Sequence, residues 1–136
     1  MDDRLAPFIG EWQVKASLSD ELATATFEWI LDGRFVVQRQ QIAHPDAPDS
    51  FAVMGHEEDG YVQHYFDSRG VARRYEMTIE DGVWTLTRDA PGFAQRFTGT
   101  FSADGNTIAG AWELNGKQDF EVTYTRAGGP AGRARS

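Results

Sequence analysis

The sequence predicts an all-β fold, a ten-stranded antiparallel up-and-down β-barrel with a short helical turn at its N-terminus. Apolar and polar residues alternate over short segments through most of the chain, which is the pattern of half-buried strands. Between them stand glycine-ending pairs that supply the positive φ angles of tight hairpins. These pairs are Asp32-Gly33, Asp59-Gly60, Arg69-Gly70, Asp81-Gly82, Asp104-Gly105 and Asn115-Gly116. No joint has room for a crossover helix, so neighbouring strands should be antiparallel.

The expected elements follow the chain in order. The segment Asp2–Gly10 should form the helical turn. The expected strands are Trp12–Leu18, Ala25–Leu31, Phe35–Ala43, Phe51–Glu57, Tyr61–Asp67, Val71–Ile79, Val83–Arg88, Phe93–Ser102, Thr107–Leu114 and Lys117–Arg126. An open meander would leave two edges, which closure into a barrel removes. A two-sheet sandwich is the alternative, and only His44–Ser50 and Asp89–Gly92 look long enough for the connections it needs.

Length and composition fit one domain. The 136 residues are 40% hydrophobic and carry a formal net charge of −8. We expect the barrel over residues 1–126 and a flexible tail over 127–136. The acidic balance argues against nucleic-acid binding, and no apolar run is long enough to span a membrane. Without cysteine there is no disulfide framework or thiolate metal site, and we expect a cytoplasmic monomer or homodimer.

Hairpin loops predict which side chains share a face. A two-residue loop at Asp81-Gly82 places Ile79 opposite Trp84 and Met77 opposite Leu86, which puts four apolar residues on one face. We expect that face to be the barrel interior. The same rule at Asp104-Gly105 makes Phe101 and Phe97 face inward as well.

The same two-residue rule at Arg69-Gly70 brings polar groups inside. It places His64 opposite Tyr75, and Arg73 then points the same way. A two-residue loop at Asp59-Gly60 puts Gly55 beside His64, where its missing side chain leaves room. These side chains are expected to point into one cavity.

A three-residue loop at Leu31–Gly33 is expected between the second and third strands, because a glycine in its last position suits a bulged hairpin. This register makes Arg39 face inward with Phe35 and Val37. The further residues expected on the inward face include Gln41, Phe51, Val53, Phe66, Gln95, Val122 and Tyr124.

Arg73 is the first candidate ligand-binding residue. A charge on an inward face must be paired or hydrated, and a guanidinium presents a fork of donors to a carboxylate or phosphate. The alternative is a structural pair with a buried acid or a position at the barrel mouth. Arg39 has the same two interpretations. The aromatic residues Trp84, Phe97 and Tyr124 are candidates as a ligand wall or as ordinary core.

His64 is a candidate proton shuttle or metal ligand, and the alternative is a histidine hydrogen-bonded to Tyr75. His56 should face solvent and His44 lies in a loop, so we expect no three-histidine metal site. At the other end of the barrel, Arg126 should cover the Trp12 ring as a structural latch, because the last strand of a closed barrel lies beside the first.

Several segments carry a resemblance to a known superfamily. The opening FIGEW (Phe8–Trp12) and closing TYTR (Thr123–Arg126) resemble the G-x-W start and terminal arginine of the calycins. The segments LDGRFVVQRQ, GHEEDGYVQHYFDSRG and DGVWTLT resemble a family of small bacterial lipocalin-like domains of uncharacterised function, itself similar to nitrobindins and fatty-acid-binding proteins. The resemblance implies an apolar cavity for a small ligand. Nitrobindin-like proteins hold haem through a histidine near the chain end, and Lys117–Arg126 contains none, so no cofactor is predicted and haem is disfavoured.

Three functions are consistent with these observations. The first is a binding protein for an apolar or amphipathic small molecule, fixed by Arg73, Tyr75, His64 and Arg39. The second is an enzyme inside such a barrel, a decarboxylase, isomerase or hydrolase of a small aromatic or lipid-like acid, with His64 or Tyr75 as acid or base. The third is a barrel filled with side chains that binds nothing.

Overall fold

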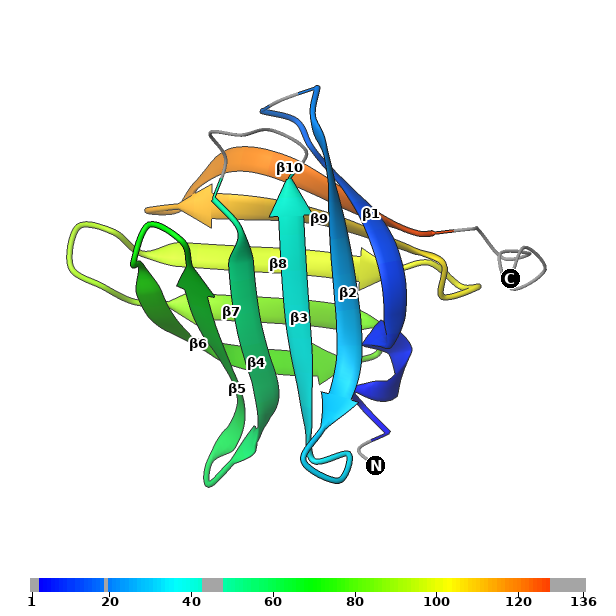
Figure 1. Ribbon diagram of the computed structural model, residues 1–136. Helices are drawn as coiled ribbons and strands as arrows, with labels where there is room; N and C mark the ends of the chain where they lie inside the picture. Colours follow the sequence, from blue (N-terminus) through cyan, green and yellow to red (C-terminus); the bar gives the residue numbers. More distant parts are fainter. Residues whose placement is uncertain (1–2, 19, 43–47, 128–136) are drawn as a thin grey trace.

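The computed structural model describes residues 3–18, 20–42 and 48–127, and it is a closed antiparallel barrel (Figure 1). Each strand pairs with its neighbours in sequence, and β1 pairs with β10 to close the sheet. The elements are η1 (Ala6–Phe8), β1 (Gly10–Ala16), β2 (Leu22–Ile30), β3 (Phe35–Ile42), β4 (Ser50–Glu57), β5 (Gly60–Asp67), β6 (Ala72–Glu80), β7 (Val83–Arg88), β8 (Gln95–Phe101), β9 (Thr107–Leu114) and β10 (Lys117–Arg126). The predicted fold class is confirmed.

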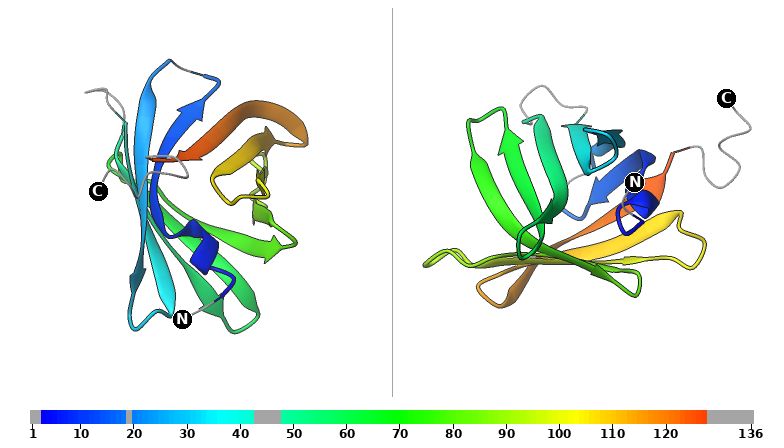
Figure 2. Two further views of the ribbon diagram at one scale, coloured as in Figure 1. Left: turned by 90° about the vertical axis from the view of Figure 1, so that its right-hand side faces the viewer. Right: turned by 90° about the horizontal axis from the view of Figure 1, so that it is seen from below.

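The barrel is flattened. Figures 1 and 2 show β2–β4 crossing β7–β9 at a steep angle, so that two curved halves face each other. The inner faces of these halves enclose the barrel interior. The side chains on the inner face of each half therefore decide what kind of molecule the interior can hold.

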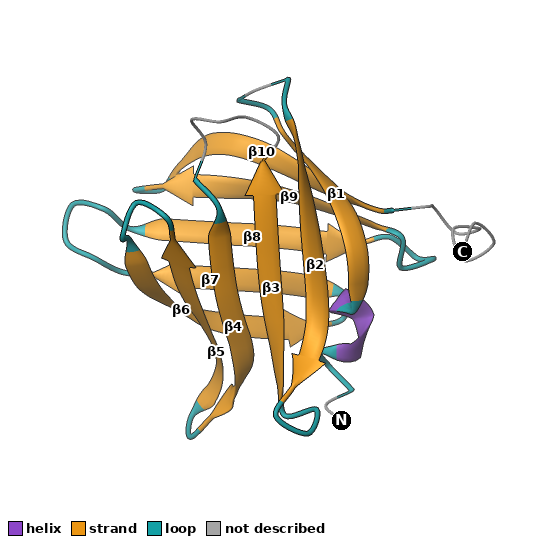
Figure 3. Ribbon diagram, in the orientation of Figure 1, coloured by secondary structure: helices purple, strands orange, loops and turns teal. Residues whose placement is uncertain are grey.

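The N-terminal 3-10 helix η1 closes one end of the barrel (Figure 3). Leu5 and Phe8 have no exposed surface, and the Phe8 ring centroid lies 4.8 Å from that of Trp84 and 5.4 Å from that of Phe27. The indole nitrogen of Trp12 donates a hydrogen bond to the Phe8 carbonyl at 2.9 Å, which fixes the helix to the start of β1. Burial of such large aromatic side chains makes this end a solid floor.

The predicted latch between Arg126 and Trp12 is confirmed. The guanidinium carbon lies 4.1 Å from the Trp12 ring centroid. The same guanidinium donates to the carbonyls of Ile9 at 2.8 Å, Pro7 at 3.0 Å and Gly105 at 3.1 Å. One side chain from the last strand therefore joins the N-terminal segment, β1 and the β8–β9 turn, and burial lowers the pKa of Arg126.

The predicted inward face is correct on every strand except β3, β4 and β5. Ile79 pairs with Trp84 and Met77 with Leu86, as the Asp81-Gly82 turn predicts. Phe97 likewise pairs with Trp112. Inward residues of β1, β2 and β6–β10 are therefore those expected from the sequence.

The predicted register of β2 with β3 is wrong by one residue. The connection is a four-residue loop, Leu31–Arg34, and Trp29 pairs with Val36 rather than with Phe35. Leu31 and Asp32 both take positive φ angles ahead of Gly33, so the turn needs one residue more than a bulged three-residue hairpin. A slip of one residue turns every side chain of a strand to the other face.

The register of β5 with β6 also differs by one residue. The loop is Ser68–Gly70, three residues long, and Tyr65 pairs with Arg73. The Asp67 carboxylate accepts the backbone N–H of Arg69 at 2.9 Å and so favours the longer turn. This second slip restores the expected face from β6 onward, so only β3, β4 and β5 are turned over. Their expected inward residues therefore face outward: Phe35, Val37, Arg39, Gln41, Phe51, Val53, His64 and Phe66.

Two predictions fall wholly or largely outside the described residues. They are the loop position of His44 and the flexible tail at 127–136, of which only Ala127 is described. Within the described part of the chain, no helix has the length and apolar character to cross a membrane.

Candidate functional site

A cavity of about 870 Å³ occupies the barrel above the aromatic floor. Its wall includes Leu18 and Glu21 from the β1–β2 connection, Pro48 ahead of β4 and Arg69 from the β5–β6 turn. These loops lie at the end of the barrel opposite η1, so the cavity opens there (Figure 1). We call this open end the mouth. The volume falls within the range of small-molecule sites, roughly 300–1,000 Å³.

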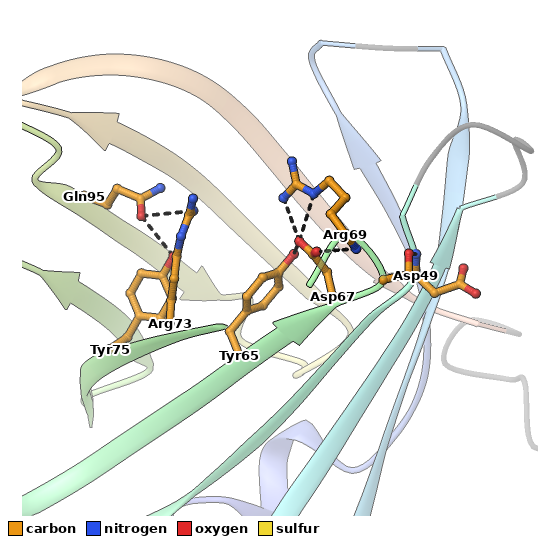
Figure 4. A network of polar contacts seen from close by, with 8 residues as sticks. Asp49, Tyr65, Asp67, Arg69, Arg73, Tyr75 and Gln95 are labelled. Carbon is orange, nitrogen blue, oxygen red and sulfur yellow. Dashed lines mark hydrogen bonds and ion pairs between the residues drawn. The ribbon is translucent and has the colours of Figure 1, made fainter. Parts of the chain in front are cut away.

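Arg73 lies at the mouth with one polar partner, Gln95, and one aromatic partner, Phe93. Its guanidinium lies 3.5 Å from Gln95 Oε1, which also accepts the hydroxyl of Tyr75 at 3.0 Å (Figure 4). The guanidinium carbon stands 5.0 Å from the Phe93 ring centroid. Among the described residues, Arg73 forms no ion pair with a carboxylate. Its positive charge is positioned at the cavity and is not neutralised by any of these residues.

A second arginine at the mouth is already paired. Arg69 Nη2 lies 2.6 Å from Asp67 Oδ2, and the same oxygen accepts the Tyr65 hydroxyl at 2.9 Å (Figure 4). The Arg69 hydrogen bond holds the pKa of Asp67 well below its usual range, although the Asp67 side chain has no exposed surface. Burial, with the bond to Asp67, raises the pKa of Tyr65 to about 12. The charges of Arg69 and Asp67 neutralise each other and Tyr65 donates to the same carboxylate, so Arg73 is the better candidate to bind an anion.

Three glutamines line the opposite half of the cavity. Gln38 and Gln40 come from β3, where Gln38 Nε2 lies 3.4 Å from Gln40 Oε1. Gln63 comes from β5, is 5% exposed, and its Oε1 is buried without a hydrogen-bond partner among the described residues. Tyr124 also lines the cavity, and burial raises its pKa to about 12. This wall presents neutral donors and acceptors rather than charge.

The wall facing the glutamines is aromatic. Trp84 and Trp112 both line the cavity, and the Trp84 indole nitrogen is buried with no hydrogen-bond partner in the described part of the chain. Phe97 is not among the lining residues. Its ring lies over Gly99 and Gly110, where a Cβ on either glycine would clash with it, and it packs 4.8 Å from Trp84 and 5.2 Å from Trp112. Phe97 therefore supports the aromatic wall from behind instead of contacting a ligand.

Two predicted site residues lie outside the barrel. Arg39 pairs with Glu28 at 2.8 Å and is 52% exposed, while His64 lies 2.8 Å from Glu57. Their predicted inward orientation is wrong because the hairpin loop before β3 is one residue longer than expected. The residues that the structure brings together at the cavity are Arg73, Tyr75, Trp84 and Tyr124.

The glutamine wall and Tyr65 were missed for the same reason. Gln38, Gln40 and Gln63 alternate with the residues expected to be inside, so the one-residue slip exchanged the two sets. One sequence signal points to the correct register. Phe35 pairs with Gly55 and its ring covers that glycine on the outer face, an aromatic–glycine pairing that recurs in sheets.

The described residues contain no group of three or more histidine, cysteine, aspartate or glutamate side chains placed to hold a metal ion. The polar groups around the cavity are amides, phenols, indoles and guanidinium groups, with the Ser50 hydroxyl and the Glu21 carboxylate. Such groups suit an organic ligand with polar oxygen atoms.

No protein-family model and no curated protein matches the sequence. Among solved structures, the crystal structure of Echinococcus granulosus fatty-acid-binding protein 1 is similar, with a TM-score of 0.67 at 11% sequence identity. The match covers 90% of this chain and 98% of that chain. At this identity the likeness shows the fold alone. The chain is thus a closed ten-stranded antiparallel barrel whose fold is similar to that of this fatty-acid-binding protein.

Proposed function

We propose that the protein binds an amphipathic small molecule whose apolar body fills the barrel and whose anionic end lies at the mouth beside Arg73. The observation that carries this proposal is a cavity of about 870 Å³ with an arginine at its rim that has no carboxylate partner among the described residues. A barrel filled with side chains would leave no such space. The similar fold of a protein named for fatty-acid binding supports the same class of ligand.

The contacts of Arg73 favour a carboxylate. Gln95 and Phe93 hold the guanidinium by one long hydrogen bond and a ring contact, neither of which neutralises its charge. The Tyr75 hydroxyl donates a hydrogen bond to the same Gln95 oxygen, which holds it close to the Arg73 guanidinium. A bound carboxylate would accept charge-assisted hydrogen bonds that are stronger than those of neutral groups. The aromatic wall of Trp84 and Trp112 would contact the apolar body.

The alternative, an enzyme acting inside the barrel, keeps only part of its support. Its acid or base was expected to be His64 or Tyr75. His64 lies on the outer face beside Glu57, so the interior candidate is Tyr75 alone. We retain ligand binding as the proposal. The cytoplasmic location, the monomeric or homodimeric state and the absence of nucleic-acid partners stay predictions from the sequence.

Binding of dodecanoic acid and of dodecanol tests the proposal. Both should quench or shift the fluorescence of Trp84 and Trp112, which line the cavity. Replacing Arg73 by Gln should weaken the acid about tenfold or more, since a hydrogen bond to a charged group contributes roughly 1.5–3 kcal/mol, and should leave the alcohol unchanged. Arg74→Gln is the matched control, because it removes the same charge from the exposed outer face of the same strand. Equal loss in both variants, or no binding of either probe, would refute the proposal.

A further inference from the structure

We infer that the ligand of this cavity carries a second, neutral oxygen function on its apolar body, bound by the amide of Gln63 on the β3–β5 wall. This inference rests on the proposed function, because it specifies the ligand of the same cavity. It narrows the class from plain apolar acids to oxygenated ones, such as hydroxylated acids with one acidic end.

The Gln63 amide is the observation that carries the inference. The residue is 5% exposed and lines the cavity, its Oε1 is buried without a partner, and its side chain makes no hydrogen bond with any described residue. Buried amides in proteins are nearly always hydrogen-bonded, since leaving one unpaired is costly. An unpaired amide at a ligand cavity is therefore best explained by a partner that the ligand supplies.

Neighbouring groups explain why that partner is neutral. Gln38 Nε2 lies 3.4 Å from Gln40 Oε1, and the register partners of Gln63 are Met54 and Tyr75, so no charged side chain stands directly beside Gln63 on its neighbouring strands. An amide offers both a donor and an acceptor, and a half-turn about its last torsion exchanges them. This suits a hydroxyl, which both donates and accepts.

The strand register sets where the oxygen lies relative to the acid. Tyr65 pairs with Arg73 and Gln63 pairs with Tyr75, so Gln63 stands two residues further from the mouth than Tyr65. Two residues of strand span roughly 7 Å. A ligand anchored by its carboxylate at Arg73 therefore reaches Gln63 with its middle, not with its acidic end. A hydroxyl at an interior carbon is expected to bind better than one at the far end.

The experiment compares dodecanoic acid with its monohydroxylated isomers in four proteins: wild type, Gln63→Leu, Gln41→Leu and Arg73→Gln. In the wild type at least one interior isomer should bind about fivefold or more tightly than dodecanoic acid, the effect of one added hydrogen bond. Gln63→Leu, of similar volume, should abolish that preference. Gln41→Leu, an exposed glutamine on the outer face of β3, should preserve it. Arg73→Gln should weaken all the acids by one common factor.

The two ideas fail in different ways. If the wild type binds dodecanoic acid as tightly as every isomer, or if Gln63→Leu keeps the preference, the second oxygen function is refuted while the amphipathic ligand stands. If no acid binds, or if Arg73→Gln changes none of the affinities, the proposed function itself is refuted. Unfolding curves of each variant confirm that a change in affinity does not come from a change in folding.

Discussion

Replacing Arg126 by Met tests what closes the barrel. The guanidinium donates to three backbone carbonyls and covers the Trp12 ring, and Met keeps an unbranched apolar stem while removing every donor. A charged hydrogen bond contributes roughly 1.5–3 kcal/mol and a cation–π contact roughly 1 kcal/mol. Because this end is partly open to water, the freed carbonyls regain hydration, and we expect a net loss of about 3 kcal/mol.

Urea unfolding followed by tryptophan fluorescence and circular dichroism measures this loss. For a chain of this size the melting temperature should fall by about 10 °C. Arg126→Lys should recover only a small part, because an ammonium cannot spread its donors over three carbonyls as a planar fork does. Arg96→Met, on the exposed outer face of β8, is the control for removing an arginine charge. A loss below about 1 kcal/mol in Arg126→Met would refute the latch as a stabilising element.

The remaining predictions concern the cavity and its surroundings. Gln63→Leu should stabilise the ligand-free protein by about 1 kcal/mol in urea unfolding, since it removes an unpaired buried amide; a loss would show that the amide is satisfied without a ligand. Tyr65 and Tyr124, with pKa values raised to about 12, should form tyrosinate later than an ordinary phenol in an absorbance titration. Their neutral forms favour the folded state, so this part of the stability should be complete below about pH 10 and disappear as the pH rises through 12. His64→Ala and Arg39→Ala should leave dodecanoic acid affinity within about twofold, because both side chains lie outside the barrel, and a larger effect would contradict the register.

The sequence predicted the closed barrel because its evidence is local. Asp81-Gly82 and Asp104-Gly105 encode their turns in neighbouring residues, and the alternation around them has one apolar face. The latch followed from closure alone, since a barrel must bring its last strand beside its first. Arg73 and Tyr75 were placed correctly because β6 shows strict alternation, with Met77 and Ile79 buried on the same face.

The orientation of β3–β5 needed information that alternation does not contain. In β3, Val36 and Val37 are both buried, one inside the barrel and the other on its outer face beneath neighbouring side chains. Apolar residues on both faces leave the choice of face to the length of the preceding loop, and that loop depends on Leu31 and Asp32 taking positive φ angles that few such residues adopt. The orientation of β3–β5 therefore depends on an unusual backbone conformation of the Leu31–Arg34 loop, which the alternation of apolar and polar residues does not predict.

Turning over β3–β5 changes which residues line the interior, and it also changes the charge that those residues bring. With Arg39 and His64 inside, the cavity would have held charges on both halves and favoured a ligand charged at several points. With Gln38 and Gln63 inside instead, one half is neutral and polar, and the cation Arg73 stands at the mouth. A charge buried deep in a barrel needs a partner at the same depth, whereas a charge at the mouth keeps some water and can accept ligands of different length. The register therefore favours a ligand that enters with its apolar end first and leaves its acidic group at the rim.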